Sequence, residues 1–264
     1  MLLAIDIGNT HTVIGVYKGA TLEHHFRLST DRNRTEDEYN VFLKHLLDDH
    51  DLALARVTAT VVASVVPPLT TVVHRWCVQR LGFEPLVIGP GIKTGMPVLY
   101  ENPREVGADR IVNGVAAYER YRNQAGGPHG VIAVDFGTAT TFDVISPRGE
   151  YMGGAIAPGV QISCDALFSR AARLPRVELV VPASPIGRTT ETSLQAGILY
   201  GYVGLVDGMV ERMQSALEYK PRVIATGGLA SLIAPLSRCI EEVDDNLTIE
   251  GMRIVHGRNH GSSK

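Results

Sequence analysis

Cysteine is scarce in this chain of 264 residues, and the three present, Cys77, Cys164 and Cys239, are widely spaced. None forms a C-x-x-C pair, so the sequence predicts neither a disulfide framework nor a zinc site. A chain without structural disulfides fits a reducing compartment, and we expect a cytoplasmic protein. Residues 1–6 include no basic leader and carry an acid within the apolar run, which argues against a signal peptide.

Long hydrophobic runs and a strong charge imbalance are also missing. The longest apolar stretch, residues 57–69, is broken by polar side chains and by the Pro67-Pro68 pair, far short of the ~18 to 20 clean residues of a membrane span. With 25 Lys and Arg against 28 Asp and Glu, the net charge of −3 does not suit a nucleic-acid-binding surface. We therefore expect neither a membrane nor a nucleic acid as a partner.

What the chain does contain is a repeat, within a globular composition of 45% hydrophobic and 20% charged residues. Residues 4–13 read AIDIGNTHTV and residues 133–142 read AVDFGTATTF, at a constant offset of 129. The gapless comparison aligns three pairs: Asp6 with Asp135, Gly8 with Gly137, and Thr12 with Thr141. Each copy has apolar runs on both sides of its glycine, the pattern of a β-hairpin. Because the segment 126–130 is rich in glycine, we expect two similar halves, residues 1–125 and 131–264.

Helical patterns alternate with these strands. Thr35 and Glu38 form a capping-box pattern before an apolar stripe, which predicts a helix to about residue 50. Further helices are expected at about 108–123 and 193–217; four glycines in the latter would let another backbone approach, although we favour an ordinary packing helix. Residues 223–237 read as a strand, a glycine-rich turn and a helix. The chain is therefore expected to be an α/β protein.

The sequence D-I-G-N-T at 6–10 has the chemistry of a phosphate-binding turn. Its glycine lets backbone N–H groups approach phosphate oxygens, and its acid can hold Mg²⁺ directly or through water. A single Asp-x-Gly turn is commonly only a turn. The second copy at 135–141 and a third glycine turn at 226–228 favour a nucleotide embraced from opposite sides of a cleft. No G-x-x-x-x-G-K-[ST] stretch occurs, so a P-loop is excluded.

Asp109 and Arg110 are candidates for chemistry at the start of the expected helix near 108. A carboxylate there is kept ionised by exposed N–H groups and the helix dipole. From the residues alone, Asp109 is as readily an N-cap as a proton acceptor, and Arg110 is either a donor to an anionic substrate or half of a surface salt bridge. The histidines, including His11, show no pair at the spacing of a metal motif.

Seven ordered motifs together resemble the type III pantothenate kinases of the actin-like superfamily. They are D-I-G-N-T at 6–10, S-V-V-P at 64–67, T-G at 94–95 with Y-x-N-P at 100–103, G-A-D-R at 107–110 with Asn113, D-F-G-T-A-T-T at 135–141, G-G-A-I-A-P-G at 153–159, and T-G-G at 226–228. The resemblance covers residues 2 to about 232. It implies ATP-dependent phosphorylation of pantothenate, the first step toward coenzyme A. The implied fold has two actin-like, ribonuclease H-like halves, with mixed sheets flanked by helices and a nucleotide cleft between them.

The resemblance also implies a role for each matching residue. The ATP-binding set is Asp6, Ile7, Gly8, Asn9, Thr10, His11, Thr12, Val13 and Thr138. The pantothenate-binding set is Tyr100, Gly107, Ala108, Asp109, Arg110 and Thr190, with Asp109 as general base. Asp135 is implied to bind a monovalent cation, potassium or ammonium, and Asp6 to hold Mg²⁺. Thr190 is implied to reach the neighbouring subunit of a homodimer. The family often has Asn where this chain has Thr189, and both threonines also suit a helix cap.

Two other functions stay open from the sequence. One is a non-catalytic, nucleotide-binding regulator of the accessory-factor kind. The other is a kinase of the same superfamily that acts on a different small alcohol. Asp109 and Arg110 favour an enzyme, because a protein without turnover needs neither a base nor a substrate clamp.

Overall fold

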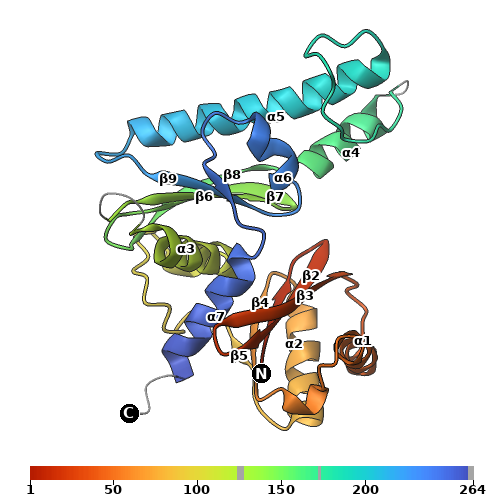
Figure 1. The fold of residues 1–264 in the computed structure, drawn as a ribbon, viewed down its shortest axis with the longest axis vertical. Helices are drawn as coiled ribbons and strands as arrows, with labels where there is room; N and C mark the ends of the chain where they lie inside the picture. Colours follow the sequence, from red (N-terminus) through yellow and green to blue (C-terminus); the bar gives the residue numbers. More distant parts are fainter. Residues whose placement is uncertain (124–127, 172–173, 261–264) are drawn as a thin grey trace. The chain divides into compact units, whose positions relative to one another are not determined.

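The structure, a computed structural model, describes residues 1–123, 128–171 and 174–260, which form two compact units (Figure 1). The first unit combines Met1–Pro97 and Glu101–Ala116 with the C-terminal helix, and the second combines Val98–Tyr100 with most of Ala117–Asn246. Each unit contains a five-stranded mixed sheet. The three cysteines are free. Among the described residues, no helix is both long enough and apolar enough to cross a membrane.

The first sheet has the order β3-β2-β1-β4-β5. Its strands are β1 (Leu2–Ile7), β2 (His11–Lys18), β3 (Thr21–Ser29), β4 (Ala59–Ser64) and β5 (Leu86–Val87). The central strand β1 pairs antiparallel with β2 and parallel with β4. Because Leu3, Ile5 and Ile7 share one face of β1, they are all fully buried in the same hydrophobic cluster.

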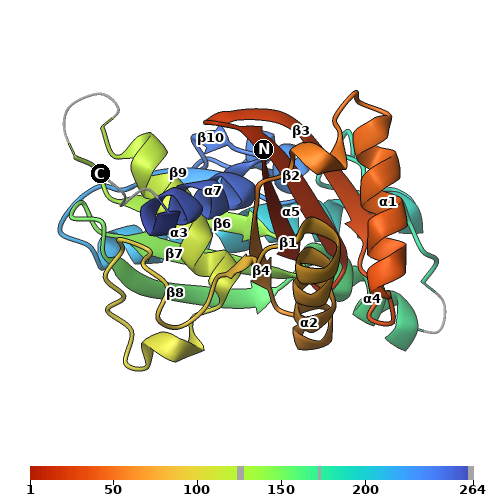
Figure 2. The same cartoon turned by 90° about the horizontal axis from the view of Figure 1, so that it is seen from below.

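Helices cover both faces of this sheet (Figure 1 and Figure 2). They are α1 (Glu36–Asp48), α2 (Pro67–Trp76, continued by a π turn over Cys77–Leu81) and α7 (Leu247–His260), with a short 3₁₀ turn at Leu54–Arg56. The expected capping box starts α1: the Thr35 hydroxyl accepts from the Glu38 backbone N–H, and the Glu38 carboxylate accepts from the Thr35 N–H at 2.8 Å. The first predicted helix is therefore confirmed, with its end at Asp48.

The second sheet repeats this plan with the order β10-β9-β6-β7-β8. Its strands are β6 (Val131–Phe136), β7 (Ala139–Ile145), β8 (Tyr151–Pro158), β9 (Arg222–Thr226) and β10 (Glu242–Val243). Here β6 takes the place of β1, antiparallel to β7 and parallel to β9. The helices of this unit are α4 (Val160–Arg170), α5 (Thr190–Ser215) and α6 (Ala230–Ile233, continued by a 3₁₀ turn at Ala234–Leu236). Two sheets of the same topology confirm the predicted repeat.

The division of the chain departs from the expected boundary. Part of the expected linker at 126–130 lies outside the described residues. The sequence analysis predicted no helix at Leu247–His260 and assigned these residues to the second half, but they form α7 and belong to the first unit. The reason is its apolar face: Leu247, Ile249 and Met252 are buried, and a side chain at Gly15 of β2 would press on Ile249. The helix α3 (Ala108–Tyr121) is divided, with residues up to Ala116 in the first unit.

The long helix α5 also differs in detail from its prediction. It begins at Thr190 rather than near residue 193, because Thr189, one of the two threonines expected to suit a helix cap, forms a capping box with Thr192. A Cβ atom at Gly197, Gly201 or Gly204 would meet nothing within 4 Å. No backbone of the described chain therefore approaches this face, and the ordinary packing helix is the correct description within one subunit.

Candidate functional site

The first phosphate hairpin is the β1–β2 turn of the first unit. Its strands pair up to Ile7 and Thr12, which leaves residues 8–11 as the loop. The Gly8 N–H donates to the His11 carbonyl at 3.0 Å, and a Cβ atom on Gly8 would stand 3.0 Å from that same oxygen. A larger residue would open this tight turn. Asp6, half-buried, lies one residue before the end of the central strand, next to Ala63 of β4.

The segment after β3 lies against this loop. The Thr30 N–H donates to the Thr10 carbonyl at 2.9 Å, and the Thr30 hydroxyl lies 2.9 Å from the Thr12 hydroxyl. The exposed Arg32 donates from Nη2 to Asn9 Oδ1 at 3.1 Å. Sequence reasoning missed Arg32. The signal was available, since β3 returns antiparallel along β2 and must end beside the hairpin loop.

Asp109 lies in the first turn of α3, half-buried, where the sequence placed it. Its Oδ1 accepts from the Arg110 backbone N–H at 2.9 Å. A Cβ atom at Gly107 would collide with the same oxygen, so Gly107 leaves the space that the carboxylate occupies. The side chain of Arg110 is buried, with 7% of its surface exposed. The structure therefore places an acidic and a basic residue next to each other in the first turn of α3, with the arginine buried.

The second hairpin is one residue tighter than the first. Its strands pair up to Phe136 and Thr140, so the loop is 137–139. The partner of Thr12 in the repeat is therefore Thr140 and not Thr141, as the gapless alignment predicted. Both Thr12 and Thr140 are fully buried. The error arises because one residue is missing from the second loop, which shifts the offset from 129 in the first strand to 128 in the next.

Two distant glycines lie directly on this second hairpin. Gly227, at the end of β9, has φ +93°, and a Cβ atom there would stand 2.5 Å from Asp135 Oδ1. A Cβ atom on Gly159 would collide with the Thr138 carbonyl. The G-G-A-I-A-P-G motif at 153–159 and the T-G-G motif at 226–228, which are far apart in the sequence, therefore both contact the second hairpin at Thr138 and Asp135. The absence of a side chain at Gly227 leaves space beside the Asp135 carboxylate oxygen. Such a space suits a cation that takes oxygen ligands.

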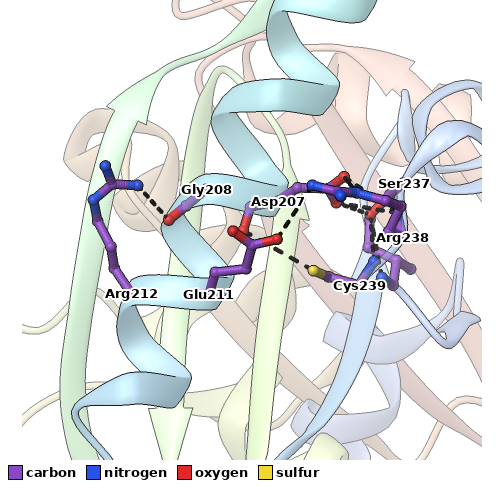
Figure 3. A network of polar contacts seen from close by, with 8 residues as sticks. Asp207, Gly208, Glu211, Arg212, Ser237, Arg238 and Cys239 are labelled. Carbon is purple, nitrogen blue, oxygen red and sulfur yellow. Dashed lines mark hydrogen bonds and ion pairs between the residues drawn. The ribbon is translucent and has the colours of Figure 1, made fainter.

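The segment that follows α6 is held in place by Asp207 of α5, which contacts Ser237 and Arg238 (Figure 3). Asp207 is buried and accepts from the Ser237 hydroxyl at 2.6 Å and from the Arg238 backbone N–H at 3.2 Å. Burial raises the pKa of the Asp207 carboxyl, but the hydrogen bonds from Ser237 and Arg238 outweigh burial and hold this pKa below its ordinary value of 3.8. The network fixes the segment that follows α6 onto α5.

The remaining expected residues, Tyr100 and Thr190, also lie in the second unit. Tyr100, 37% exposed, stands beside Tyr151 at the edge strand β8. Thr190 is exposed at the start of α5, where Thr189 supplies the cap and leaves the Thr190 hydroxyl outside the capping box. A hollow of about 620 Å³ is lined by Leu174, Gly187, Arg188, Thr189, Thr190, Ser193 and Leu194. Within the described parts of the chain, no group of three or more His, Cys, Asp or Glu residues is arranged to hold a metal ion.

Comparison with known proteins gives consistent matches. The family model described as type III pantothenate kinase matches residues 2–212. A curated relative from Anaeromyxobacter sp. (strain K), named Type III pantothenate kinase, is 57% identical over 259 residues, covering 98% of this chain and 100% of the relative.

Solved structures resemble the chain at lower identity. One, described as a Baf family transcriptional activator from Campylobacter jejuni, has 19% identity and a TM-score of 0.60, covering 98% of this chain and 99% of that one. Another, described as a 2-dehydro-3-deoxygalactonokinase from Sinorhizobium meliloti, has 12% identity and a TM-score of 0.57, covering 100% and 98%. At these identities the likeness shows the fold alone, and it confirms the actin-like class.

Proposed function

This chain belongs to the type III pantothenate kinase family, and we propose how its own residues carry out the phosphorylation of pantothenate in coenzyme A biosynthesis. The chain is a kinase by this membership. ATP is the phosphoryl donor. The assignments below rest on the family motifs together with the local geometry of each unit.

Asp109 is the proposed general base. Its carboxylate accepts the proton of the primary hydroxyl of pantothenate as that oxygen bonds to the γ-phosphorus of ATP. The bond between the γ-phosphorus and the bridging oxygen breaks, and ADP leaves with the electron pair. Phosphoryl transfer requires little beyond positioning and charge stabilisation, and a carboxylate at the start of α3 with space left by Gly107 supports this role.

The two hairpins are the proposed phosphate-binding elements. Residues 6–13 and Thr138 bind the phosphates of ATP with backbone N–H groups and hydroxyls. Arg32, hydrogen-bonded to Asn9 at the first loop, adds a guanidinium that suits a phosphate oxygen. Asp6 would hold Mg²⁺, which supplies neutralisation of phosphate charge when bound.

The pantothenate contacts are proposed from the residues that match the family motifs. Tyr100, Arg110 and the backbone at 107–108 bind the substrate's carboxylate and amide groups. Thr190 of the partner subunit completes the site in a homodimer, which the hydroxyl left outside the capping box supports. Asp135 would hold a monovalent cation, potassium or ammonium, at the cradle left by Gly227. We propose a cytoplasmic location, which the three free cysteines support.

The observation that carries the proposal is the match of the G-A-D-R motif to the first turn of α3, within a chain 57% identical to a named relative. The test is to incubate the purified protein with ATP, Mg²⁺ and pantothenate, with and without K⁺, and to detect phosphopantothenate by mass. A parallel panel of small alcohols measures specificity. Nucleotide binding without any phosphorylated product would instead support the regulatory function.

A further inference from the structure

A β-bulge at the edge of the second sheet decides where Tyr151 points. The register of β7 and β8 shifts so that Ile145 pairs with Tyr151, and Met152 is left without an opposite residue. Opposite residues of an antiparallel pair lie on the same face, and so do alternate residues of one strand. Without the bulge, Tyr151 would stand opposite Ser146 and face away from Asp143. The bulge therefore turns Tyr151 onto the face that carries Asp143.

Asp143 and Tyr151 form a buried hydrogen bond on that face. The Tyr151 hydroxyl donates to Asp143 Oδ1 at 2.7 Å, and neither residue has any exposed surface. The Thr141 hydroxyl donates to the other carboxylate oxygen at 3.3 Å. Hydrogen bonds to a carboxylate are stronger than neutral ones, and a buried carboxylate is costly without them. The pair therefore fixes the Tyr151 ring in one orientation.

Tyr100 is positioned next to the Tyr151 ring by contacts of its backbone segment and of its own ring. The segment before it joins the edge of β8 through a parallel bridge of Val98 with Tyr151, and the Leu99 N–H donates to the Tyr151 carbonyl at 2.8 Å. The ring centroids of Tyr100 and Tyr151 are 6.4 Å apart with an interplanar angle of 55°, within the range of favourable aromatic pairs.

Gly153 supplies the other support for Tyr100. It has φ +113°, a conformation that favours glycine, and a Cβ atom placed on it would lie 3.6 Å from the Tyr100 ring. The Tyr100 ring thus lies close both to the backbone of Gly153 and to the ring of Tyr151. A tyrosine with more than a third of its surface exposed is held by its neighbours in a defined place.

We infer that Asp143 and Tyr151 are positioning residues for pantothenate binding, acting through Tyr100. The inference rests on the proposed role of Tyr100 as a pantothenate contact. A side chain that is already oriented loses less conformational entropy when it forms a hydrogen bond with substrate. Removing the Asp143–Tyr151 bond would release the Tyr151 ring, and with it the support of Tyr100. The binding of ATP would be untouched, because neither residue lies in the hairpin loops at 8–11 and 137–139.

Tyr151→Phe tests this inference, because it keeps the ring and removes only the hydroxyl. We expect the KM for pantothenate to rise about three- to tenfold, the range for one lost hydrogen bond, with an unchanged KM for ATP. Tyr118→Phe is the matched control: its hydroxyl donates to the Pro147 carbonyl at 3.1 Å in the same unit and makes no bond to Asp143 or Tyr151. We expect this control to keep the wild-type KM for both substrates.

Tyr100→Ala, alone and combined with Tyr151→Phe, separates the possible results. If Tyr151 acts through Tyr100, the double variant has the pantothenate KM of Tyr100→Ala alone. Multiplied effects in the double variant, or a wild-type KM in Tyr151→Phe, overturn the inference while the Tyr100 contact stands. If Tyr100→Ala itself keeps the wild-type KM, the proposed contact is wrong.

A second variant covers the case in which Tyr151→Phe does not fold, as judged by thermal melting. Asp143→Asn is nearly isosteric and keeps an acceptor for the Tyr151 hydroxyl, but it replaces the charged hydrogen bond with a weaker neutral one. We expect a smaller rise in the pantothenate KM in the same direction, again absent in the Tyr100→Ala background. An equal change in the KM of both substrates would indicate a merely structural role and would overturn the inference.

Discussion

Gly227 lies against the carboxylate of Asp135, although the two residues are 92 positions apart in the chain. A methyl group at Gly227 would stand 2.5 Å from Asp135 Oδ1 and 2.7 Å from the Phe136 nitrogen. The contact exists because β9 runs parallel to β6 and ends beside it, with Thr226 paired to Asp135. The third glycine turn is therefore part of the surroundings of the second hairpin.

Gly227→Ala is expected to lower activity by about tenfold or more and to raise the K⁺ concentration needed for half-maximal activity. The added methyl group displaces Asp135, and the positive φ adds strain of about 1–3 kcal/mol. Enzyme assays over a potassium titration measure both effects. Gly91→Ala is the control, because Gly91 has a similar φ of +95° but open space around it. A potassium curve unchanged from wild type would remove Asp135 from the cation site.

Asp109→Asn is expected to keep the fold and ATP binding but to lower kcat by ~10²–10⁴-fold, because an amide cannot accept the hydroxyl proton. Single-turnover assays and a nucleotide-binding titration make the comparison. The exposed Asp245 provides a matched control, and Asp245→Asn should retain wild-type turnover. Turnover close to wild type in Asp109→Asn would contradict its role as base.

Arg32→Ala is expected to raise the KM for ATP by about tenfold, the effect of one lost charge-assisted hydrogen bond to phosphate, without changing the KM for pantothenate. Arg27→Ala, an exposed arginine on β3, is the control. The complementary Asp6→Asn should alter the Mg²⁺ dependence of the rate. An ATP KM that does not move would leave Arg32 as a surface residue that only contacts Asn9.

A mixture of Asp109→Asn and Thr190→Ala chains is expected to recover activity that each parent lacks. In a heterodimer, both substitutions fall in one shared site and the other site is intact. Dilution below the dissociation constant of the dimer should also lower specific activity. Subunit exchange is verified by mass before the assay. A mixture that exchanges but stays as inactive as its parents would refute the shared site.

The Asp207 network predicts a pH dependence of stability. Because the folded-state pKa of Asp207 lies below its ordinary value of 3.8, its contribution is fully present above that value and is lost as the pH falls through the lower folded-state pKa. Asp207→Asn should therefore reduce the free energy of unfolding at pH 6 and make it less steeply dependent on pH below about 4. Urea melts across this range measure it, with the exposed Asp245→Asn as control. Parallel pH curves for wild type and Asp207→Asn would argue against the network.

Local signals in the sequence were enough for much of this fold. The hairpins, the Thr35 capping box and the α/β alternation each depend on residues close together in the chain. The placement of α7 could not be predicted in this way, because it depends on which sheet buries Leu247 and Met252. The apolar pattern of residues 247–260 would be the same whether the helix packed on the first or on the second sheet.

The candidate site shows the same limit. Asp109 stands at the helix start that its motif predicted, since Gly107 and Asp109 interact within one turn. The contact of Gly227 with Asp135 and the turning of Tyr151 by the bulge depend on strand register, which no short motif encodes. Arg32 was missed for a related reason, since its position follows from the length of β3.

The unequal loops of the two hairpins have a consequence for tracing the ancestry of the two halves. Residues 8–11 connect one hairpin and residues 137–139 the other, yet the strand after each loop presents the same order of buried and half-buried side chains. A one-residue insertion or deletion has been absorbed wholly within the loop, leaving the faces of both strands intact. A comparison of the halves that allows no gap there would pair the buried Thr12 with the half-buried Thr141, and the half-buried Val13 with the buried Phe142. Any alignment of the two halves must therefore place its gap within the hairpin loop itself.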